Sequence, residues 1–256
     1  MTPSDMRPLQ VVTSTLALAA VALLAAGCAS GPASPAPTSS GSGGATESTS
    51  LPPSDDFGPM PDDIEAAWVD GGRSFAVVTW GSSGTDCQPA TAEATADGQT
   101  VTVVLSDPET DGDVACTTEL GPRAILVETP EGVDITKDVE LNVTYGDIRD
   151  DAELDALSAP MPMDTDYQPT AGWFDDDGIV LLTWGSSTCR PQVQDVAQTD
   201  AGATVTFAEI DGACSQDMAP RLTVLSLQTE HDDDAPFALT LKGGGLDGTV
   251  DVLGRG

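Results

Sequence analysis

The chain of 256 residues carries 42 Asp and Glu residues against 9 Lys and Arg, which gives a formal net charge of −33 at pH 7. This charge argues against nucleic acid as a partner and against direct adsorption to anionic lipid, because both would need the opposite sign. Hydrophobic residues make up 39% of the chain, enough for small buried cores, so a wholly disordered chain is also excluded.

The N-terminus has the pattern of a targeting segment. Arg7 precedes an apolar run from about residue 11 to 26, which ends in Leu-Ala-Ala-Gly-Cys with the cysteine at position 28. A run this short is typical of a signal peptide rather than of a membrane-spanning helix. These five residues resemble the lipobox of bacterial lipoproteins, and the remainder, rich in Ala, Gly, Pro and Asp, resembles lipoproteins of high-GC Gram-positive bacteria.

The resemblance implies a cleaved signal peptide at residues 1–27 and a lipid on the thiol of Cys28. The protein is then expected outside the cytoplasm, with the membrane as its partner through that lipid. An ordinary signal peptide followed by a chance cysteine is the alternative. Residues 28–56 are mostly Ser, Gly, Pro and Thr and predict a disordered tether that spans about 30 Å.

Two copies of one pattern fill the remaining chain. Thr-Trp-Gly-Ser-Ser stands at 79–83 and again at 183–187, and in each copy a Cys-x-Pro sequence, a second cysteine and a Pro-Arg pair follow. The pattern predicts a first β domain at residues 57–146, a linker with a short helix at 147–159, and a second β domain at 160–256. The repeated motif residues outside the cysteines are Trp80, Gly81, Ser82, Trp184, Gly185, Ser186, Arg123 and Arg221.

Short apolar stretches predict strands throughout both copies. The runs at 75–80 and 179–184 are rich in β-branched residues and end at Gly-Ser-Ser, which predicts strands buried on both faces. The expected fold is all-β: two tandem, homologous, small β-sandwich domains, immunoglobulin-like or barrel-like, each with one intradomain disulfide. Apolar runs and alternation between turn dipeptides predict further strands at 100–105, 124–127, 139–143, 204–207, 222–227 and 237–241.

The cysteines support this arrangement. With Cys28 lipidated, four cysteines remain, two in each copy, in a compartment that permits disulfides. One pairing scheme respects the duplication, Cys87 with Cys116 and Cys189 with Cys214, and each link would contribute about 3–4 kcal/mol. A metal site is the alternative, but no CxxC spacing or histidine accompanies these cysteines, so no metal and no cofactor is predicted.

The candidate catalytic residues have plain structural interpretations. His231, the one histidine, lies in an acidic loop, where a solvated residue is favoured over a member of a Ser-His-Asp triad. Ser82-Ser83 and Ser186-Ser187 lack the G-x-S-x-G spacing of a nucleophile elbow and are expected to turn the chain and cap backbone groups. No catalytic residue and no enzymatic activity is therefore predicted.

Acidic and aromatic residues leave alternatives open. Residues 107–113 are similar to a calcium loop, but Thr118 stands where a bidentate Glu belongs, so an acidic hairpin loop is favoured. Arg123 and Arg221 are expected to form ion pairs with nearby carboxylates. Four tryptophans at matched positions are expected to pack beside the disulfides, with stacking on wall sugars as the alternative: Trp68, Trp80, Trp173 and Trp184.

The resulting hypothesis is a lipid-anchored, non-catalytic binding or structural module of the cell envelope. Tandem modules would raise avidity for a repetitive partner such as wall glycan or another envelope protein. A ligand-binding lipoprotein associated with transport is the main alternative, and an envelope hydrolase is less favoured. A further alternative has the two copies packed face to face with a ligand held between them. The sequence predicts no oligomeric state.

Overall fold

A computed structural model describes residues 63–82, 87–109, 116, 120–158, 167–199, 201–230 and 235–254. The chain divides into two compact units, Met1–Pro53 and Ser54–Gly256, and every described residue belongs to the second. The predicted signal peptide, Cys28, the tether and His231 therefore lie outside the described residues. Within these ranges, no helix has the length and apolar character that a membrane span requires.

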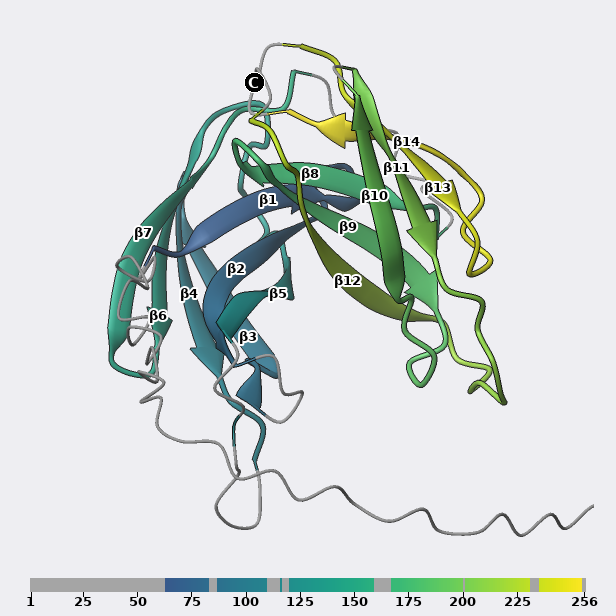
Figure 1. Cartoon of the computed structure of the whole chain (residues 1–256). Helices are drawn as coiled ribbons and strands as arrows, with labels where there is room; N and C mark the ends of the chain where they lie inside the picture. Colours follow the sequence, from purple (N-terminus) through teal and green to yellow (C-terminus); the bar gives the residue numbers. More distant parts are fainter. Residues whose placement is uncertain are drawn as a thin grey trace, which may run out of the picture. The chain divides into compact units, whose positions relative to one another are not determined.

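Strands make up nearly all of the regular structure in the described residues, which confirms the all-β class (Figure 1). A 3-10 turn, η1 (Asp70–Gly72), lies between the first two strands. The first copy holds β1 (Glu65–Val69), β2 (Ser74–Ser82), β3 (Thr91–Asp97), β4 (Thr100–Ser106), β5 (Leu120–Glu128), β6 (Val139–Tyr145) and β7 (Ile148–Leu154). The second copy holds β8 (Thr170–Asp175), β9 (Gly178–Gly185), β10 (Val193–Thr199), β11 (Gly202–Phe207), β12 (Ala219–Ser226), β13 (Ala238–Lys242) and β14 (Gly248–Leu253).

Each copy contains a three-stranded and a four-stranded layer. In the first copy the strand orders are β1-β2-β5 and β3-β4-β6-β7 (Figure 1). In the second copy β8-β9-β12 and β10-β11-β13-β14 repeat these orders, and a short parallel pairing of β14 with β8 joins them into one seven-stranded sheet. The parallel pairs β4–β6 and β11–β13 also occur at matching places. The duplication of sequence is therefore a duplication of strand order.

Apolar clusters lie between successive layers. One, around Trp68, fills the space between the two layers of the first copy, and another, around Trp173, fills the second copy. A third joins the copies, because Val78 of β2 packs in the same cluster as Phe174 and Leu182 of β8 and β9. The layers therefore follow one another in a solenoid-like series, with the two three-stranded layers in the middle.

This series explains why β2 and β9 are buried on both faces, as the sequence predicts. Along β2, Phe75 and Val77 pack in the core of the first copy, whereas the intervening Ala76 and Val78 pack in the cluster shared with the second copy. Successive side chains of a strand point to opposite faces, so each face needs an apolar cover. The cover of the second face is the other copy.

The structure corrects two expectations. Residues 148–154 form β7, which ends the four-stranded layer of the first copy, and not the short helix predicted in the linker. Leu154 and Leu157 suggested a helical apolar edge, but both enter the core of the first copy, Leu154 from the end of the strand and Leu157 just beyond it. The copies also do not form two separate sandwiches, because they stack face to face through the shared cluster.

The copies approach each other closely where β1 passes β8. A Cβ atom at Gly172 would lie 2.0 Å from the backbone oxygen of Trp68, so only glycine permits this approach. Nearby, the backbone N–H of Asp70 donates a buried hydrogen bond of 2.8 Å to Oγ1 of Thr170. The two copies are therefore held together by contacts of the main chain as well as by apolar packing.

Candidate functional site

The duplicated motif residues meet around one arginine in each copy. In the first copy, Arg123 of β5 donates through Nη2 to the carbonyl oxygen of Trp80 at 3.0 Å and through Nη1 to the carbonyl oxygen of Cys87. Its guanidinium lies over Gly81, where a Cβ atom would come within 2.5 Å of Cζ. We call this group of Arg123, Gly81, Trp80 and Cys87 the first clasp. It ties the end of β2 to the loop of the first cysteine and explains the glycine after the tryptophan.

Arg221 of β12 forms the second clasp from the equivalent residues. It donates to the carbonyl oxygen of Trp184 at 2.9 Å and to that of Cys189 at 3.0 Å. A Cβ atom at Gly185 would lie 2.9 Å from its Cζ atom. The repeated Trp-Gly and Pro-Arg sequences are thus accounted for by tethering of the backbone in both copies.

In the part of the chain that the structure describes, the clasp arginines have none of the acidic partners that the sequence predicts. Among the described residues neither forms an ion pair, and their hydrogen bonds go to neutral oxygens, including Oγ1 of Thr79 for Arg123. Both arginines are only 8% exposed, and the Nε–H of each is buried with no acceptor in the described residues. Burial also lowers the pKa of Arg221, because loss of water disfavours the charged form. Among the described residues, each copy therefore holds a buried guanidinium with no acidic side chain paired to it.

Both predicted disulfides are present. Cys87 is bonded to Cys116 across 29 residues, and Cys189 is bonded to Cys214 across 25 residues. Cys87 is buried, but none of the four cysteines is a member of the apolar clusters around Trp68 and Trp173. Each joins the clasped loop after the central strand to the loop before the end strand, so the disulfides link loops rather than layers.

The four tryptophans divide into two pairs. Trp68 and Trp173 are 3% and 4% exposed in the cores of their copies, which confirms core packing for this pair. Trp80 and Trp184 belong to the clasps and are half-buried. The ring of Trp184 also meets that of Tyr167 edge-on, with centroids 5.3 Å apart.

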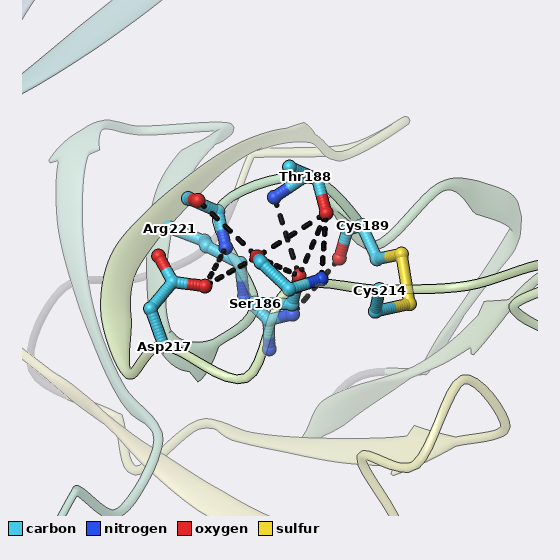
Figure 2. The surroundings of a disulfide bond; sticks show 8 residues. Ser186, Thr188, Cys189, Cys214, Asp217 and Arg221 are labelled. Carbon is cyan, nitrogen blue, oxygen red and sulfur yellow. Dashed lines mark hydrogen bonds between the residues drawn. A yellow bond between two sulfur atoms is a disulfide. The ribbon is translucent and has the colours of Figure 1, made fainter.

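Figure 2 shows hydroxyl groups in a hydrogen-bonded network beside the second disulfide. Ser215 donates its hydroxyl proton to Asp217, so Ser186, whose Oγ lies 2.7 Å from that of Ser215, is the donor in their contact. The backbone N–H of Ser187 donates to the same carboxylate at 3.1 Å. These bonds, that of Ser215 foremost, lower the pKa of Asp217 to about 2.

This network supports the structural interpretation of Ser186 and Ser187, whereas Ser83 of the first copy lies outside the described residues. A carboxylate with a pKa of about 2 is a weak base near neutral pH, and in the described residues no imidazole or amine contacts these hydroxyls. The bonds instead join the loop of Ser186 to the loop of Ser215, alongside the disulfide. His231 lies outside the described residues, so its part in a triad stays untested.

In the described part of the acidic loop after β4, the side chain of Asp107 accepts a hydrogen bond. Tyr145 donates its hydroxyl to Asp107, and burial together with this bond raises the pKa of Tyr145 to about 12. The guanidinium of Arg123 lies 5.8 Å from the centre of the same ring. In the residues that the structure describes, no group of three His, Cys, Asp or Glu side chains is placed to hold a metal ion.

Residues of both copies line a groove whose position the sequence did not reveal. It follows β5 and β12, which lie side by side and end the three-stranded layers in the described part of the chain. Its volume is about 850 Å³, within the range of ligand pockets. We call it the copy groove. Its lining residues are Gln88, Pro89, Ala90, Pro108, Pro122, Arg123, Ala124, Ile125, Leu126, Arg190, Pro220, Arg221, Leu222, Val224 and Ser226.

The sequence did hold a signal for this groove. The Cys-x-Pro and Pro-Arg sequences, present in both copies, supply much of its lining. Proline within a strand indicates an edge strand, since it cannot donate to a neighbour, and Pro122 and Pro220 both mark end strands. The sequence did not show that the two end strands, β5 and β12, would lie side by side.

The copy groove and the two clasps are the features from which a function can be inferred. Comparisons of the chain with protein-family models, with curated proteins and with solved structures find no match.

Proposed function

We propose that this protein is a non-catalytic binding module of the cell envelope, held at the membrane by lipidated Cys28 through the tether at residues 28–56. The two homologous, sandwich-like copies act as one binding body, and the copy groove is their ligand site. The observation that carries the proposal is the groove itself, an open volume of about 850 Å³ to which both copies contribute equivalent segments. The repeated residues support it, because they tether backbone and loops rather than form an acid–base pair.

A lipoprotein that captures a solute for a transporter is the second candidate function. The volume of the groove favours it, because small-molecule sites commonly occupy about 300–1,000 Å³. The two functions differ in where the ligand is found. An envelope-binding module retains a partner from the insoluble envelope fraction, whereas a solute-binding protein retains a small molecule from the medium.

The test is capture of envelope material by the full chain in mild detergent, with purified wall glycan as a separate bait. Ser226→Trp places a large ring at an exposed position of the groove, and Thr102→Trp places the same ring on the exposed face of β4 as the control. We expect one partner or glycan to be enriched by the wild type and by Thr102→Trp, and lost with Ser226→Trp. Equal enrichment by both variants would refute the groove as the site.

A further inference from the structure

The charge of the copy groove is opposite to that of the rest of the chain. Three of the 9 basic residues of the chain line it, namely Arg123, Arg190 and Arg221, and no Asp or Glu lines it in the described residues. The chain as a whole carries 42 acidic residues, so the absence of an acid from the described part of the lining is a local reversal of composition. The groove is therefore a basic site on an acidic protein.

Two of these arginines are buried cations that have no acidic partner among the described residues. Arg123 and Arg221 are the buried cations of the described residues, and each bonds only to neutral oxygens. The buried acid Asp70, by contrast, has Arg73 as its ion-pair partner. An uncompensated charge removed from water is costly, and a nearby charge of opposite sign relieves that cost. An anion in the groove would supply this charge to both clasps.

Arg190 offers the direct contact. It follows the first cysteine of the second copy, at the position that Gln88 holds in the first copy, and both residues line the groove. Its side chain is exposed and has no hydrogen-bond or ion-pair partner among the described residues. A free guanidinium presents a planar fork of donors that matches a carboxylate or a phosphate.

We propose that the copy groove binds a segment of an acidic polymer, one that carries carboxylate or phosphate groups at successive units. One acidic group pairs with Arg190, and further groups lie near the uncompensated clasps of both copies. The groove follows two strands, one from each copy, which suits an extended segment better than a compact single anion. The apolar part of its lining, including Ala124, Leu222 and Val224, faces the uncharged parts of the polymer where its units have them. This inference rests on the proposed function.

The test is calorimetric titration of the full chain with soluble probes, in about 0.15 M salt so that distant acidic residues are screened beyond a Debye length of about 8 Å. The probes are galacturonic acid trimer for carboxylate, tripolyphosphate for phosphate, neutral maltotriose, and glycerophosphoglycerol as a lipid headgroup with a single charge. Arg190→Gln removes the free cation. Arg149→Gln removes an exposed arginine of β7, outside the groove lining, as the matched control.

We expect at least one acidic trimer to bind, maltotriose to give no heat, and Arg190→Gln to weaken binding by about tenfold while Arg149→Gln leaves it unchanged. Which acidic trimer binds identifies the acidic group. No binding of either trimer, binding of maltotriose with equal affinity, or equal behaviour of the two variants would overturn the proposal. Binding of glycerophosphoglycerol as tight as that of the trimers would assign the groove to a single anion and overturn the polymer.

These outcomes are separable from the envelope-capture result. If Ser226→Trp abolishes capture and the acidic probes do not bind, the groove is a ligand site for a neutral partner. The proposed function would then stand without the acidic polymer. If the probes bind and capture is unaffected, the groove recognises acids but is not the envelope site.

Discussion

The first clasp can be tested with a matched pair of glycines. Gly81 of β2 lies directly opposite Gly121 of β5 in the strand register. A Cβ atom at position 81 would lie 2.5 Å from Cζ of Arg123, whereas a Cβ atom at position 121 would meet no atom within 4 Å. Gly81→Ala should therefore expel the guanidinium from the clasp, and Gly121→Ala should leave it in place.

The expected magnitude follows from the contacts that are lost. The displaced guanidinium gives up its bonds to the carbonyl oxygens of Trp80 and Cys87, each worth roughly 1.5–3 kcal/mol as a hydrogen bond from a charged group. Alanine recovers about 0.5–1 kcal/mol relative to glycine within a strand. Gly81→Ala should thus lower the free energy of unfolding by about 2–5 kcal/mol, and Gly121→Ala should leave it unchanged or raise it slightly.

The assay is urea unfolding with the disulfides intact, followed by tryptophan fluorescence, with the shift in midpoint read at constant slope. A double-mutant cycle adds specificity, because Gly81→Ala should cost little once Arg123→Met has already removed the guanidinium. If the two glycine variants shift the midpoint equally, or if the cycle shows no coupling, the clasp does not hold the strand end to the cysteine loop.

Further predictions concern the second disulfide and two titrating side chains near the clasps, Tyr145 and Asp217. Replacing Cys189 and Cys214 with serine removes a link across 25 residues and should lower the free energy of unfolding by about 3.5 kcal/mol in the same urea assay. The raised pKa of Tyr145, about 12, means that its stabilisation is present below pH 10 and is lost as pH rises through 12, and Tyr145→Phe should remove this alkaline loss. The lowered pKa of Asp217, about 2, means that its stabilisation is present above about pH 4 and is lost as pH falls through 2. Asp217→Asn should remove that acid dependence, and a carboxyl titration by NMR with a midpoint near 4 would contradict the hydrogen-bond network.

Local patterns in the sequence were enough to predict the all-β class and the two disulfides. The β-branched runs of β2 and β9 lie between two apolar layers. Apolar and polar residues do not alternate along them because both faces of each strand are buried. The disulfide pairing followed from the duplication, since each copy had to be complete in itself. These features depend on residues that are close in sequence or matched between copies.

Other elements left too weak a pattern. Strands β3 and β10 are exposed along most of their length and carry few large apolar residues, so their pairing with β4 and β11 is not visible in the sequence. Leu154 ends strand β7 and Leu157 lies just beyond it, and both enter the core. Their helix-like spacing is a coincidence. The copy groove depends on two edge strands from distant parts of the chain, and no local pattern states which apolar face covers which.

The stacking of the copies makes a last prediction that links fold to site. At Gly172 a Cβ atom would lie 2.0 Å from the backbone oxygen of Trp68, a clash that no side-chain rotamer can relieve. Overpacking in a well-packed core costs about 1–3 kcal/mol, and a main-chain clash places Gly172→Ala at or above the upper end. Gly248→Ala is the control, because a Cβ atom there would meet no atom within 4 Å.

If β1 and β8 hold the copies together, Gly172→Ala should separate the unfolding of the two copies into distinct urea transitions and should also abolish binding in the groove. Gly248→Ala should retain one transition and full binding. A Gly172→Ala variant that unfolds in one step and still binds would show that the groove does not need this close approach. The copies would then be held by the apolar cluster of Val78, Phe174 and Leu182 and by the hydrogen bond from Asp70 to Thr170.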